Sequence, residues 1–434
     1  MNVAVVALGK IGLPLAVQIA SKGHRVHGAD ISESVVELVN SGTVPFPGEH
    51  KLPERLTEAV ASGRLTASTD TQSAVAASEA VVVVVPLMTD ASGTPDFGAM
   101  DSATQDIAKG LRPGTLVSYE TTLPVGTTRQ RFGPMLKQGS GLGAGTDFFL
   151  VHSPERVFSG RIFSDLRRYP KLVGGINDES TKRGVEFYES VLDFDDRPDL
   201  SRPNGVWALS SAEAAELAKL AETTYRDVNI ALANQFAAFA ETAGIEIGEV
   251  IEASNSQPFS HIHRPGVAVG GHCIPVYPRF YLAGHPDAAL VETARKVNLS
   301  VPARVVSTVA EELGGLENRT VLILGASYRG GVKETAYSGV FDLVTAVEKA
   351  DGLAVVSDPM YSASELEDHG LTRWDGKSVD AVVVQSDHRA YADLGPDDLA
   401  GAEVVYDGRG ILDLARFAGS EVRVRVIGQG STTA

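Results

Sequence analysis

The chain holds one cysteine, Cys273, and places it in the turn "VGGHCIPVYP" at residues 269–278. A cysteine used only for packing more often lies inside a strand or helix as a small hydrophobe. Here the flanking glycines allow a ligand to approach closely, and their amides favour a thiolate. Pro275 stiffens the exit from the turn. We therefore predict a nucleophile at Cys273, with packing as the alternative; His272 points elsewhere on an extended chain and is a weak candidate for a base.

Three further polar residues lie where a site is plausible. Lys219 lies in "EAAELAKLAETTYRDVN", a helical pattern in which Thr223 and Arg226 continue one polar strip; a solvated face is the alternative explanation. Glu155 in "HSPERVFSG" follows the apolar run "DFFLV", and Thr122 in "ETTLPVG" follows another. Parallel α/β sheets place their ligand contacts where strands end, so both residues are candidates.

The opening segment "ALGKIG" at residues 7–12 nearly matches the dinucleotide fingerprint G-x-G-x-x-G, with Ala7 at its first position. Gly9 lets the backbone approach a pyrophosphate, and Gly12 allows close helix–strand packing. Asp30 ends the second predicted strand, where its carboxylate accepts hydrogen bonds from a ribose diol and repels a 2′-phosphate. The pattern predicts NAD as the cofactor; a structural βα turn is the alternative.

The elements that carry these residues follow a regular order. Strand and helix patterns alternate to about residue 200, which is typical of a parallel, doubly wound sheet. Residues 210–243 contain neither glycine nor proline and predict one long helix, roughly 50 Å in length, that ends at Gly244. The last third repeats the opening: "RTVLILGASYRGG" is a strand and glycine turn, and "LAVVSDP" is a strand that ends at Asp358.

The predicted fold class is therefore α/β, with two Rossmann-like doubly wound domains joined by a long central helix. The predicted boundaries are an NAD-binding Rossmann domain at 1–204, a central helical domain with the cysteine loop at 205–305, and a second Rossmann-like domain at 306–434.

Composition excludes several classes of protein. The net charge of −17 over 434 residues, without a long basic run, argues against nucleic acid or an anionic membrane as a partner. The longest apolar run, "AVVVVVP" at residues 80–86, is too short to span a bilayer and predicts a buried strand. No secretory signal and no metal site is predicted. A single cysteine allows no internal disulfide, which fits a cytoplasmic location.

Six segments in their order resemble the UDP-glucose / UDP-N-acetylmannosamine dehydrogenase family, the NAD-dependent nucleotide-sugar 6-dehydrogenases. They are "GKIGLP", "ETTLPVGTT", "SPERV", "KLAETTYRDVNIALAN", "PGVAVGGHCIPV" and "LILGASYRGGVKET". The likeness runs from Met1 to about Gly410, and the combination is highly specific. "SPERV", "RDVNIA" and "GGHCI" are more similar to the branch that acts on N-acetylhexosamines than to the UDP-glucose branch.

The resemblance implies a four-electron oxidation of a sugar C6 alcohol to a uronic acid, with two NAD consumed. It implies that Cys273 adds to the aldehyde as a thiolate, and that the thiohemiacetal is oxidised to a thioester that water hydrolyses. It assigns Lys219 to the developing oxyanion and to proton removal, and Glu155 and Thr122 to the water of hydrolysis.

The resemblance also implies binding residues. The NAD-binding positions are Gly9, Lys10, Ile11, Gly12, Asp30, Pro86 and Thr122. The positions for the nucleotide sugar are Glu155, Arg156, Lys219, Arg264, Gly270, Gly271 and Arg329, with the C-terminal domain holding the nucleotide. A homodimer is expected.

Some positions depart from the family pattern. Thr223 replaces an asparagine, Tyr277 stands where an aspartate is usual, and Ala336 and Phe259 occupy common arginine positions. Arg264 offers a cation in place of the one missing at Phe259. The departures suggest an altered sugar preference, such as a deoxythymidine-linked glucose, or a catalytically weakened nucleotide-sugar binding protein.

Another alternative is a two-electron β-hydroxyacid-type dehydrogenase, but this leaves Cys273 and the third domain without a role. Neither the sugar nor the nucleotide follows from the sequence.

Overall fold

The structure is a computed structural model that describes residues 1–90, 93–399 and 401–430. It divides into two compact units. The first comprises Met1–Glu222 with Arg279–Gly284, and the second comprises Thr223–Pro278 with the chain from His285 onward. The predicted domain boundaries at residues 204 and 305 stay a prediction, and a helix at Ala289–Leu313 runs across the second of them.

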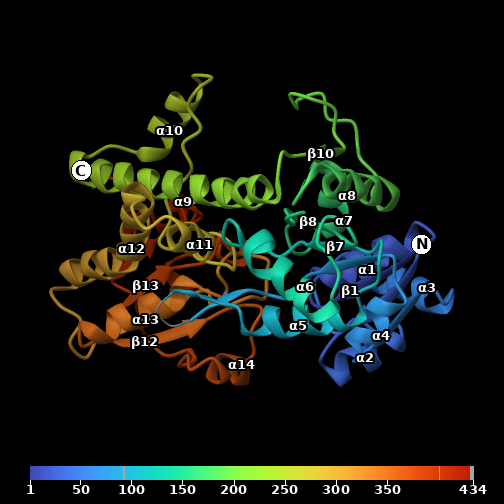
Figure 1. Cartoon of the computed structure of the whole chain (residues 1–434). Helices are drawn as coiled ribbons and strands as arrows, with labels where there is room; N and C mark the ends of the chain where they lie inside the picture. The colour runs from blue at the N-terminus through green and yellow to red at the C-terminus, as the bar shows by residue number, and fades with distance from the viewer. Residues whose placement is uncertain (91–92, 400, 431–434) are drawn as a thin grey trace. The chain divides into compact units, whose positions relative to one another are not determined.

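The first unit is built on an eight-stranded sheet, traced from blue to green in Figure 1, in the order β10-β9-β8-β7-β4-β1-β2-β3. Its strands are β1 (Asn2–Val6), β2 (Arg25–Ala29), β3 (Leu65–Ser68), β4 (Ala80–Val83), β7 (Leu116–Tyr119), β8 (Phe149–His152), β9 (Lys171–Gly175) and β10 (Val206–Ala208). A two-stranded hairpin, β5 (Met88–Thr89) and β6 (Pro95–Asp96), lies outside this sheet.

Helices alternate with these strands. They are α1 (Gly12–Ser21), α2 (Glu33–Asn40), α3 (Leu52–Ala61), α4 (Thr71–Ala76), α5 (Gly98–Gly110), a π-helical turn at Thr128–Phe132, α6 (Gly133–Ser140), α7 (Ile162–Arg168) and α8 (Asp178–Val191).

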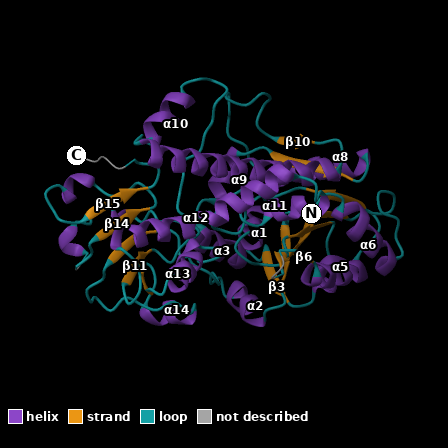
Figure 2. Cartoon of the chain, turned by 90° about the vertical axis from the view of Figure 1, so that its left-hand side faces the viewer, coloured by secondary structure: helices purple, strands orange, loops and turns teal. Residues whose placement is uncertain are grey.

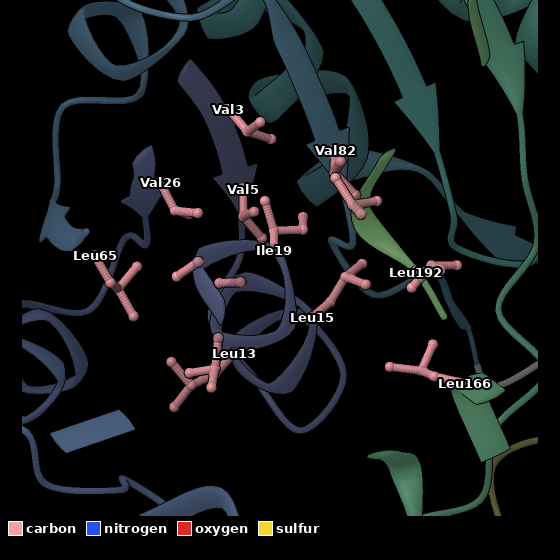
Figure 3. Packing of buried hydrophobic residues seen from close by; sticks show 14 of the residues in the cluster. Val3, Val5, Leu13, Leu15, Ile19, Val26, Leu65, Val82, Leu166 and Leu192 are labelled. Carbon is pink, nitrogen blue, oxygen red and sulfur yellow. The ribbon is translucent and has the colours of Figure 1, made fainter. Parts of the chain in front are cut away.

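The core of this unit explains the strand and helix patterns. The run "AVVV" of β4 is buried along its whole length, as expected for a central parallel strand. Figure 3 shows Ile19 of α1 beside Val5 of β1, within a cluster that also includes Leu15 and Val82. Burial of such side chains is the main favourable contribution to folding, at about 1.5–3 kcal/mol each.

One pairing differs from the predicted all-parallel sheet. Strand β9 runs antiparallel to β8, with Val151 opposite Gly175 and His152 opposite Gly174. Every other neighbouring pair in the sheet is parallel. Residues 153–170 return the chain along the same edge of the sheet instead of crossing its face, so the first residue of β9 lies at the edge where β7 and β8 end.

The long central helix is confirmed. Helix α9 runs unbroken for 32 residues, Ala212–Ala243, and Gly244 follows in the left-handed region with φ of +71°. Glycine adopts this conformation at the ends of helices without a steric penalty.

The second unit contains a five-stranded parallel sheet in the order β12-β11-β13-β14-β15, drawn in orange in Figure 2. Its strands are β11 (Thr320–Leu324), β12 (Leu353–Ser357), β13 (Ala381–Val384), β14 (Val404–Asp407) and β15 (Arg423–Val426). Strand β15 is not among the strands predicted from the sequence; its alternating arginines and valines are at most half-buried.

The remaining helices are α10 (Ile247–Asn255), α11 (Tyr277–Gly284), α12 (Ala289–Leu313), α13 (Gly339–Lys349) and α14 (Ala363–Asp368), with 3₁₀ turns at Arg389–Tyr391, Pro396–Asp398 and Leu414–Phe417. The C-terminal stretch of α9, together with α12 and α13, packs against the sheet in one apolar core. The α/β fold class with two Rossmann-like sheets is thus confirmed. No helix in the described part of the chain is both long enough and apolar enough to cross a membrane.

Candidate functional site

The turn after β1 has the geometry of a dinucleotide-binding turn. Ala7 occupies the left-handed region with φ of +74°, the conformation for which the fingerprint normally supplies a glycine. A Cβ on Gly12 would overlap the carbonyl oxygen of Ala7, so the start of α1 requires a glycine there. A Cβ on Gly9 would meet nothing within 4 Å, so the backbone at Gly9 faces open space.

These residues fit an NAD molecule. Helix α1 begins without a side-chain cap, since Ile11 offers none, so no capping side chain competes with a pyrophosphate at this helix N-terminus. Asp30 follows β2 directly, and its carboxylate accepts the backbone N–H groups of Leu8 at 2.8 Å and Ser32 at 3.0 Å. These two bonds leave lone pairs for a ribose diol. Lys10 and Pro86, two other predicted contacts, are exposed near the carboxyl ends of β1 and β4.

The carboxyl ends of β7 and β8 bring two predicted residues into adjacent loops. Thr122 is buried in the loop after β7, at 4% exposure. Glu155 lies in the loop after β8, and its backbone N–H donates to the carbonyl of Glu120 at 3.1 Å. The Glu155 side chain is 13% exposed, and its Oε1 accepts the backbone N–H groups of Arg156 at 2.6 Å and Val157 at 3.1 Å.

A buried lysine that the sequence analysis missed joins this edge. Lys171, the first residue of β9, donates to Glu120 Oε2 at 2.6 Å and to Glu155 Oε2 at 3.2 Å. Burial raises the pKa of Glu120, which the ammonium only partly offsets. For Glu155 burial acts in the same direction, but Lys171 and the backbone donors outweigh it and hold the pKa below its usual range. The available signal was a lone cation in the apolar stretch "YPKLVGG".

Two more buried groups border these carboxylates. His152 is fully buried, its ring nitrogens have no hydrogen-bond partner among the described residues, and burial with the nearby Lys171 lowers its pKa to about 3. Tyr188 donates its hydroxyl hydrogen to Glu120 Oε1 at 2.6 Å. His152 is therefore a neutral imidazole at neutral pH.

The N-terminal part of α9 adds the predicted lysine. Lys219 is 6% exposed, and its Nζ lies 3.4 Å from Glu222 Oε1. The other oxygen of Glu222 accepts Arg156 Nε at 2.8 Å. One carboxylate thus links Lys219 to the segment that carries Glu155, so the structure brings these predicted residues together within the first unit.

Glu216, one turn before Lys219, ties α9 to the loop that contains Thr122. Its carboxylate accepts the N–H of Gly126 at 2.5 Å, and the N–H and hydroxyl of Thr128 at 2.8 and 2.7 Å. Burial raises the pKa of Glu216 to about 7 despite these bonds. The loop and the helix are therefore held in register by a side chain that the sequence analysis did not single out.

The predicted thiol belongs to the second unit. Cys273 is exposed and free. Its carbonyl accepts the N–H of Tyr277 at 2.9 Å, which begins α11 immediately after the turn. Gly271 has φ of +88° and donates its N–H to the carbonyl of Ala336 at 3.0 Å. His272 lies 3.5 Å from Glu334 through Nε2, so its ring is turned toward that carboxylate.

The glycines of this turn rest on the loop after β11. A Cβ on Gly270 would lie 2.6 Å from Tyr328 Cβ and 2.8 Å from the carbonyl oxygen of Tyr337, and neither contact is sterically possible. Arg329 is exposed and donates through Nε to the Tyr328 hydroxyl at 3.1 Å. The cysteine turn therefore packs through its two glycines against the loop that carries Arg329, and both segments lie within the second unit.

Arg264 lies in a segment, residues 261–266, that three asparagines hold in place. Asn229 and Asn234 of α9 and Asn255 of α10 bond backbone atoms of this segment at 2.7 to 3.0 Å. Arg264 itself is exposed. The segment "RDVNIALAN" thus supplies two of the residues that fix the approach to the cysteine turn.

The described residues contain no cluster of three or more His, Cys, Asp or Glu placed to hold a metal ion. The chemistry available at these positions is therefore that of a thiol, carboxylates and cations, together with the dinucleotide turn.

Three family models match the chain in order. They describe the NAD binding domain (residues 1–192), the central domain (213–300) and the UDP binding domain (322–414) of the UDP-glucose/GDP-mannose dehydrogenase family. The first of these matches the region of the dinucleotide turn, so NAD is the cofactor, as that turn predicts.

Individual proteins agree with the models. The chain is 32% identical to the UDP-N-acetyl-D-mannosamine dehydrogenase of Pyrococcus horikoshii, over 95% of this chain and 96% of that protein. It is 30% identical to an NDP-N-acetyl-D-galactosaminuronic acid dehydrogenase of Ralstonia nicotianae, over 96% and 97% of the two chains. The solved structure of the UDP-D-ManNAc dehydrogenase from Pyrococcus horikoshii superposes with a TM-score of 0.87, at 30% identity over 99% of each chain.

Proposed function

The chain belongs to the UDP-glucose/GDP-mannose dehydrogenase family, and we propose that it oxidises the C6 alcohol of a nucleoside-diphosphate sugar to a carboxylate in two steps. The observation that carries the proposal is the state of Cys273: the single thiol of the chain is exposed, in a turn whose glycines seat on the loop after β11. A two-electron dehydrogenase has no use for such a thiol.

In the first oxidation the C6 alcohol loses a proton and a hydride and becomes an aldehyde. Bound NAD supplies the hydride acceptor in each oxidation. Lys219 stabilises the negative charge on the C6 oxygen as the proton leaves, because its ammonium is nearly buried and its contact with Glu222 holds it in place.

In the second oxidation the carbon needs a removable hydride again. The Cys273 thiolate adds to the aldehyde carbon, and the oxyanion so formed takes a proton to give a thiohemiacetal. Loss of the hydride and of the hydroxyl proton converts this adduct into a thioester. The aldehyde is never released, because it stays bonded to the sulfur.

Hydrolysis then frees the enzyme. We assign Glu155 as the base that takes a proton from water as the water attacks the thioester carbon, and Thr122 as a group that holds this water. The C–S bond breaks and the thiolate leaves. A Glu155 pKa below its usual range keeps this carboxylate ionised at neutral pH, as a base requires.

The proposed substrate is a UDP-N-acetylhexosamine. The two relatives described above are named for N-acetyl-D-mannosamine and N-acetyl-D-galactosaminuronic acid substrates. UDP-glucose and dTDP-glucose stay as alternatives because Thr223, Tyr277 and Ala336 depart from the family pattern. Arg329 lies on the loop against which the cysteine turn packs, and Arg264 precedes that turn in the chain. Both are exposed cations, and we assign both to the nucleotide sugar.

We also propose a homodimer in the cytoplasm. Four large apolar side chains of α9 lie at helical spacing along one face and are exposed by 40% to 68%: Tyr225, Leu232, Phe236 and Phe239. An apolar stripe of this kind on one helix is typical of an interface. The proposed chemistry needs Cys273 as a reduced thiol, which fits a cytoplasmic location.

The deciding experiment compares the stoichiometry of the wild-type protein with that of Cys273→Ser. The wild-type protein is expected to yield two NADH for each sugar consumed, in a screen of UDP-N-acetylmannosamine, UDP-N-acetylglucosamine, UDP-glucose, dTDP-glucose and GDP-mannose. Cys273→Ser is expected to yield one NADH for each sugar consumed, because no thioester can form and the aldehyde is no longer held on a sulfur.

His272→Gln is the matched control, since it changes the adjacent exposed side chain and leaves the thiol intact; it should retain two NADH per sugar. One NADH per sugar in the wild-type protein would support the two-electron alternative instead. Sugar binding by calorimetry without any NADH would point to a binding protein.

A further inference from the structure

The carboxyl edge of the first sheet contains a buried cluster of three ionisable groups, of which the proposed reaction explains only Glu155. Lys171 is 5% exposed and lies between Glu120, which is fully buried, and Glu155. A buried ion pair seldom stabilises a fold relative to apolar residues of similar size, because its desolvation offsets its attraction. Three ionisable groups kept together at the ends of two strands therefore indicate a functional role.

The strand directions create this cluster. Because β9 runs antiparallel to β8, its first residue, Lys171, lies at the edge where β7 and β8 end. A parallel β9 would begin at the opposite edge of the sheet. The cluster thus results from the one antiparallel pairing of the sheet.

Glu120 holds the Lys171 ammonium in place. Its Oε2 accepts Lys171 Nζ at 2.6 Å, while its Oε1 accepts the Tyr188 hydroxyl at 2.6 Å. That hydroxyl is also bonded to Ser118 Oγ at 2.7 Å, and the Lys171 ammonium lies 4.8 Å from the centre of the Tyr188 ring. Both oxygens of Glu120 are therefore occupied, and the ammonium has little freedom to move.

Hydrogen bonds to both oxygens orient the Glu155 carboxylate. Backbone N–H groups of its own loop bond Oε1, and Lys171 bonds Oε2. Arg156 does not serve as the cation for its neighbour, because its guanidinium pairs with Glu222. Lys171 is consequently the ammonium that orients the carboxylate assigned above as the hydrolytic base.

We propose that Lys171 is a positioning residue for Glu155 in thioester hydrolysis, held in place by Glu120. The inference rests on the proposed function, since it requires a thioester on Cys273. The Lys171 ammonium is engaged by Glu120 Oε2 and Glu155 Oε2, so it acts on the reaction through Glu155. It holds the carboxylate in its ionised form and in one orientation, while the water gives its proton to Glu155 and the C–S bond breaks.

The charged and titratable groups around Glu155 come from five elements: Lys171 of β9, Glu120 after β7, His152 of β8, Tyr188 of α8 and Arg156 of its own loop. His152 is neutral near pH 7, and Arg156 remains with Glu222. Removal of Lys171 is therefore expected to raise the pKa of Glu155, because burial then acts without the opposing ammonium.

The test measures the two half-reactions of Lys171→Met separately. The first hydride transfer is followed as NADH formation in a single turnover, and hydrolysis is followed as loss of the acyl adduct on Cys273 by mass spectrometry from pH 5 to 9. We expect hydrolysis near pH 7 to slow by about tenfold or more, with its acidic limb moved upward by about one pH unit. The first hydride transfer should change by no more than about twofold.

Lys171→Arg should restore the acidic limb to within about half a pH unit of the wild type, because the cation is restored. Lys22→Met is the matched control, since it removes a lysine paired with Asp193 at the surface of the same unit, and its profile should equal that of the wild type. If Lys171→Met does not fold, the double variant Glu120→Gln/Lys171→Met removes the buried pair together and should still show an upward shift, smaller because Glu120 no longer repels Glu155.

A folded Lys171→Met or double variant with an unchanged acidic limb would overturn the inference and leave the two-step reaction standing. An equal slowing of both half-reactions would also overturn it, because that result indicates a general structural role. A wild-type protein that makes one NADH per sugar and no acyl adduct would overturn both the inference and the proposed function.

Discussion

The two Rossmann-like sheets begin with nearly the same turn and use it differently. In the first, β1 is followed by Ala7, whose N–H donates to Ala29, and Asp30 then accepts the N–H of Leu8. In the second, Gly325 donates to Ser357, and Asp358 accepts the N–H of Ala326. Positions 7 and 325 both have positive φ, of 74° and 111°. The backbone design is therefore shared.

The two aspartates, Asp30 and Asp358, differ in exposure and in the number of hydrogen bonds that they accept. Asp30 is partly exposed and accepts two backbone N–H groups. Asp358 is 6% exposed and accepts the N–H groups of Ala326, Ser327 and Met360 as well as His388 Nε2. Internal bonds occupy Asp358, so it has little capacity left for a ribose, whereas Asp30 keeps free lone pairs.

The helices that follow the two turns differ in how their N-termini are capped. Helix α1 begins at Gly12, close to its turn and without a side-chain cap, whereas α13 begins at Gly339 and is capped by Ser338. The intervening residues 326–338 of the second turn contact the cysteine loop through Tyr328, Ala336 and Tyr337. The first turn thus leaves its helix N-terminus uncapped for an anion, whereas the second turn packs against the cysteine turn.

The largest effect is expected for Gly12→Ala. The added Cβ overlaps the carbonyl oxygen of Ala7, so the free energy of unfolding should fall by about 1–3 kcal/mol and NAD binding should be lost. Gly9→Ala is the matched control because its Cβ meets no atom. It should unfold like the wild type and still bind NAD more weakly, since the methyl group lies where the pyrophosphate approaches. Thermal melts measure the stability of the two variants, and fluorescence titration measures their affinity for NAD. Equal stability of Gly12→Ala and Gly9→Ala would contradict the requirement for a glycine at the start of α1.

A smaller effect is expected for Asp358→Asn. Burial opposes its charge, but His388 and the backbone donors outweigh burial and lower the pKa of Asp358 from 3.8 to about 2. A pKa that is lower in the folded protein than in the unfolded chain stabilises the fold at every pH above the unfolded-state pKa. That stabilisation is lost as the pH falls through the folded-state pKa. For Asp358 it amounts to about 2 kcal/mol, lost between about pH 4 and pH 2.

Asp358→Asn should therefore lower stability at pH 7 and flatten its dependence on pH between 4 and 2, with NAD affinity unchanged. Asp30→Asn should weaken NAD binding by about tenfold and should lower stability less than Asp358→Asn does, because Asp30 accepts fewer internal hydrogen bonds. Urea unfolding across pH and NAD titration check the pair. If Asp358→Asn weakened NAD as much as Asp30→Asn, the division of labour between the two turns would be wrong.

The smallest effect is expected for Ala7→Gly. Relief of the left-handed conformation gains about 1–2 kcal/mol, and the greater freedom of glycine in the unfolded chain removes about 0.5–1 of it. A net stabilisation of up to about 1.5 kcal/mol should raise the melting temperature slightly. A lower melting temperature would show that the Ala7 methyl group contributes packing that outweighs its strain.

Local patterns predicted much of this molecule. The absence of glycine and proline over residues 210–243 predicts a helix that the structure places at Ala212–Ala243. The turn at residues 7–12 and Asp30 predict the NAD-binding unit. These predictions succeed because each depends on residues close together in the chain, where propensity and spacing act directly.

The sequence by itself determined the two α/β sheets, the central helix, the cofactor and the candidate thiol, because short-range periodicity and turn chemistry encode them. Only the tertiary structure decided that β9 reverses direction and delivers Lys171 to Glu120 and Glu155. Those contacts join residues 51 and 16 positions apart. No local pattern specifies such a meeting, because the direction of a strand depends on the whole sheet that it joins.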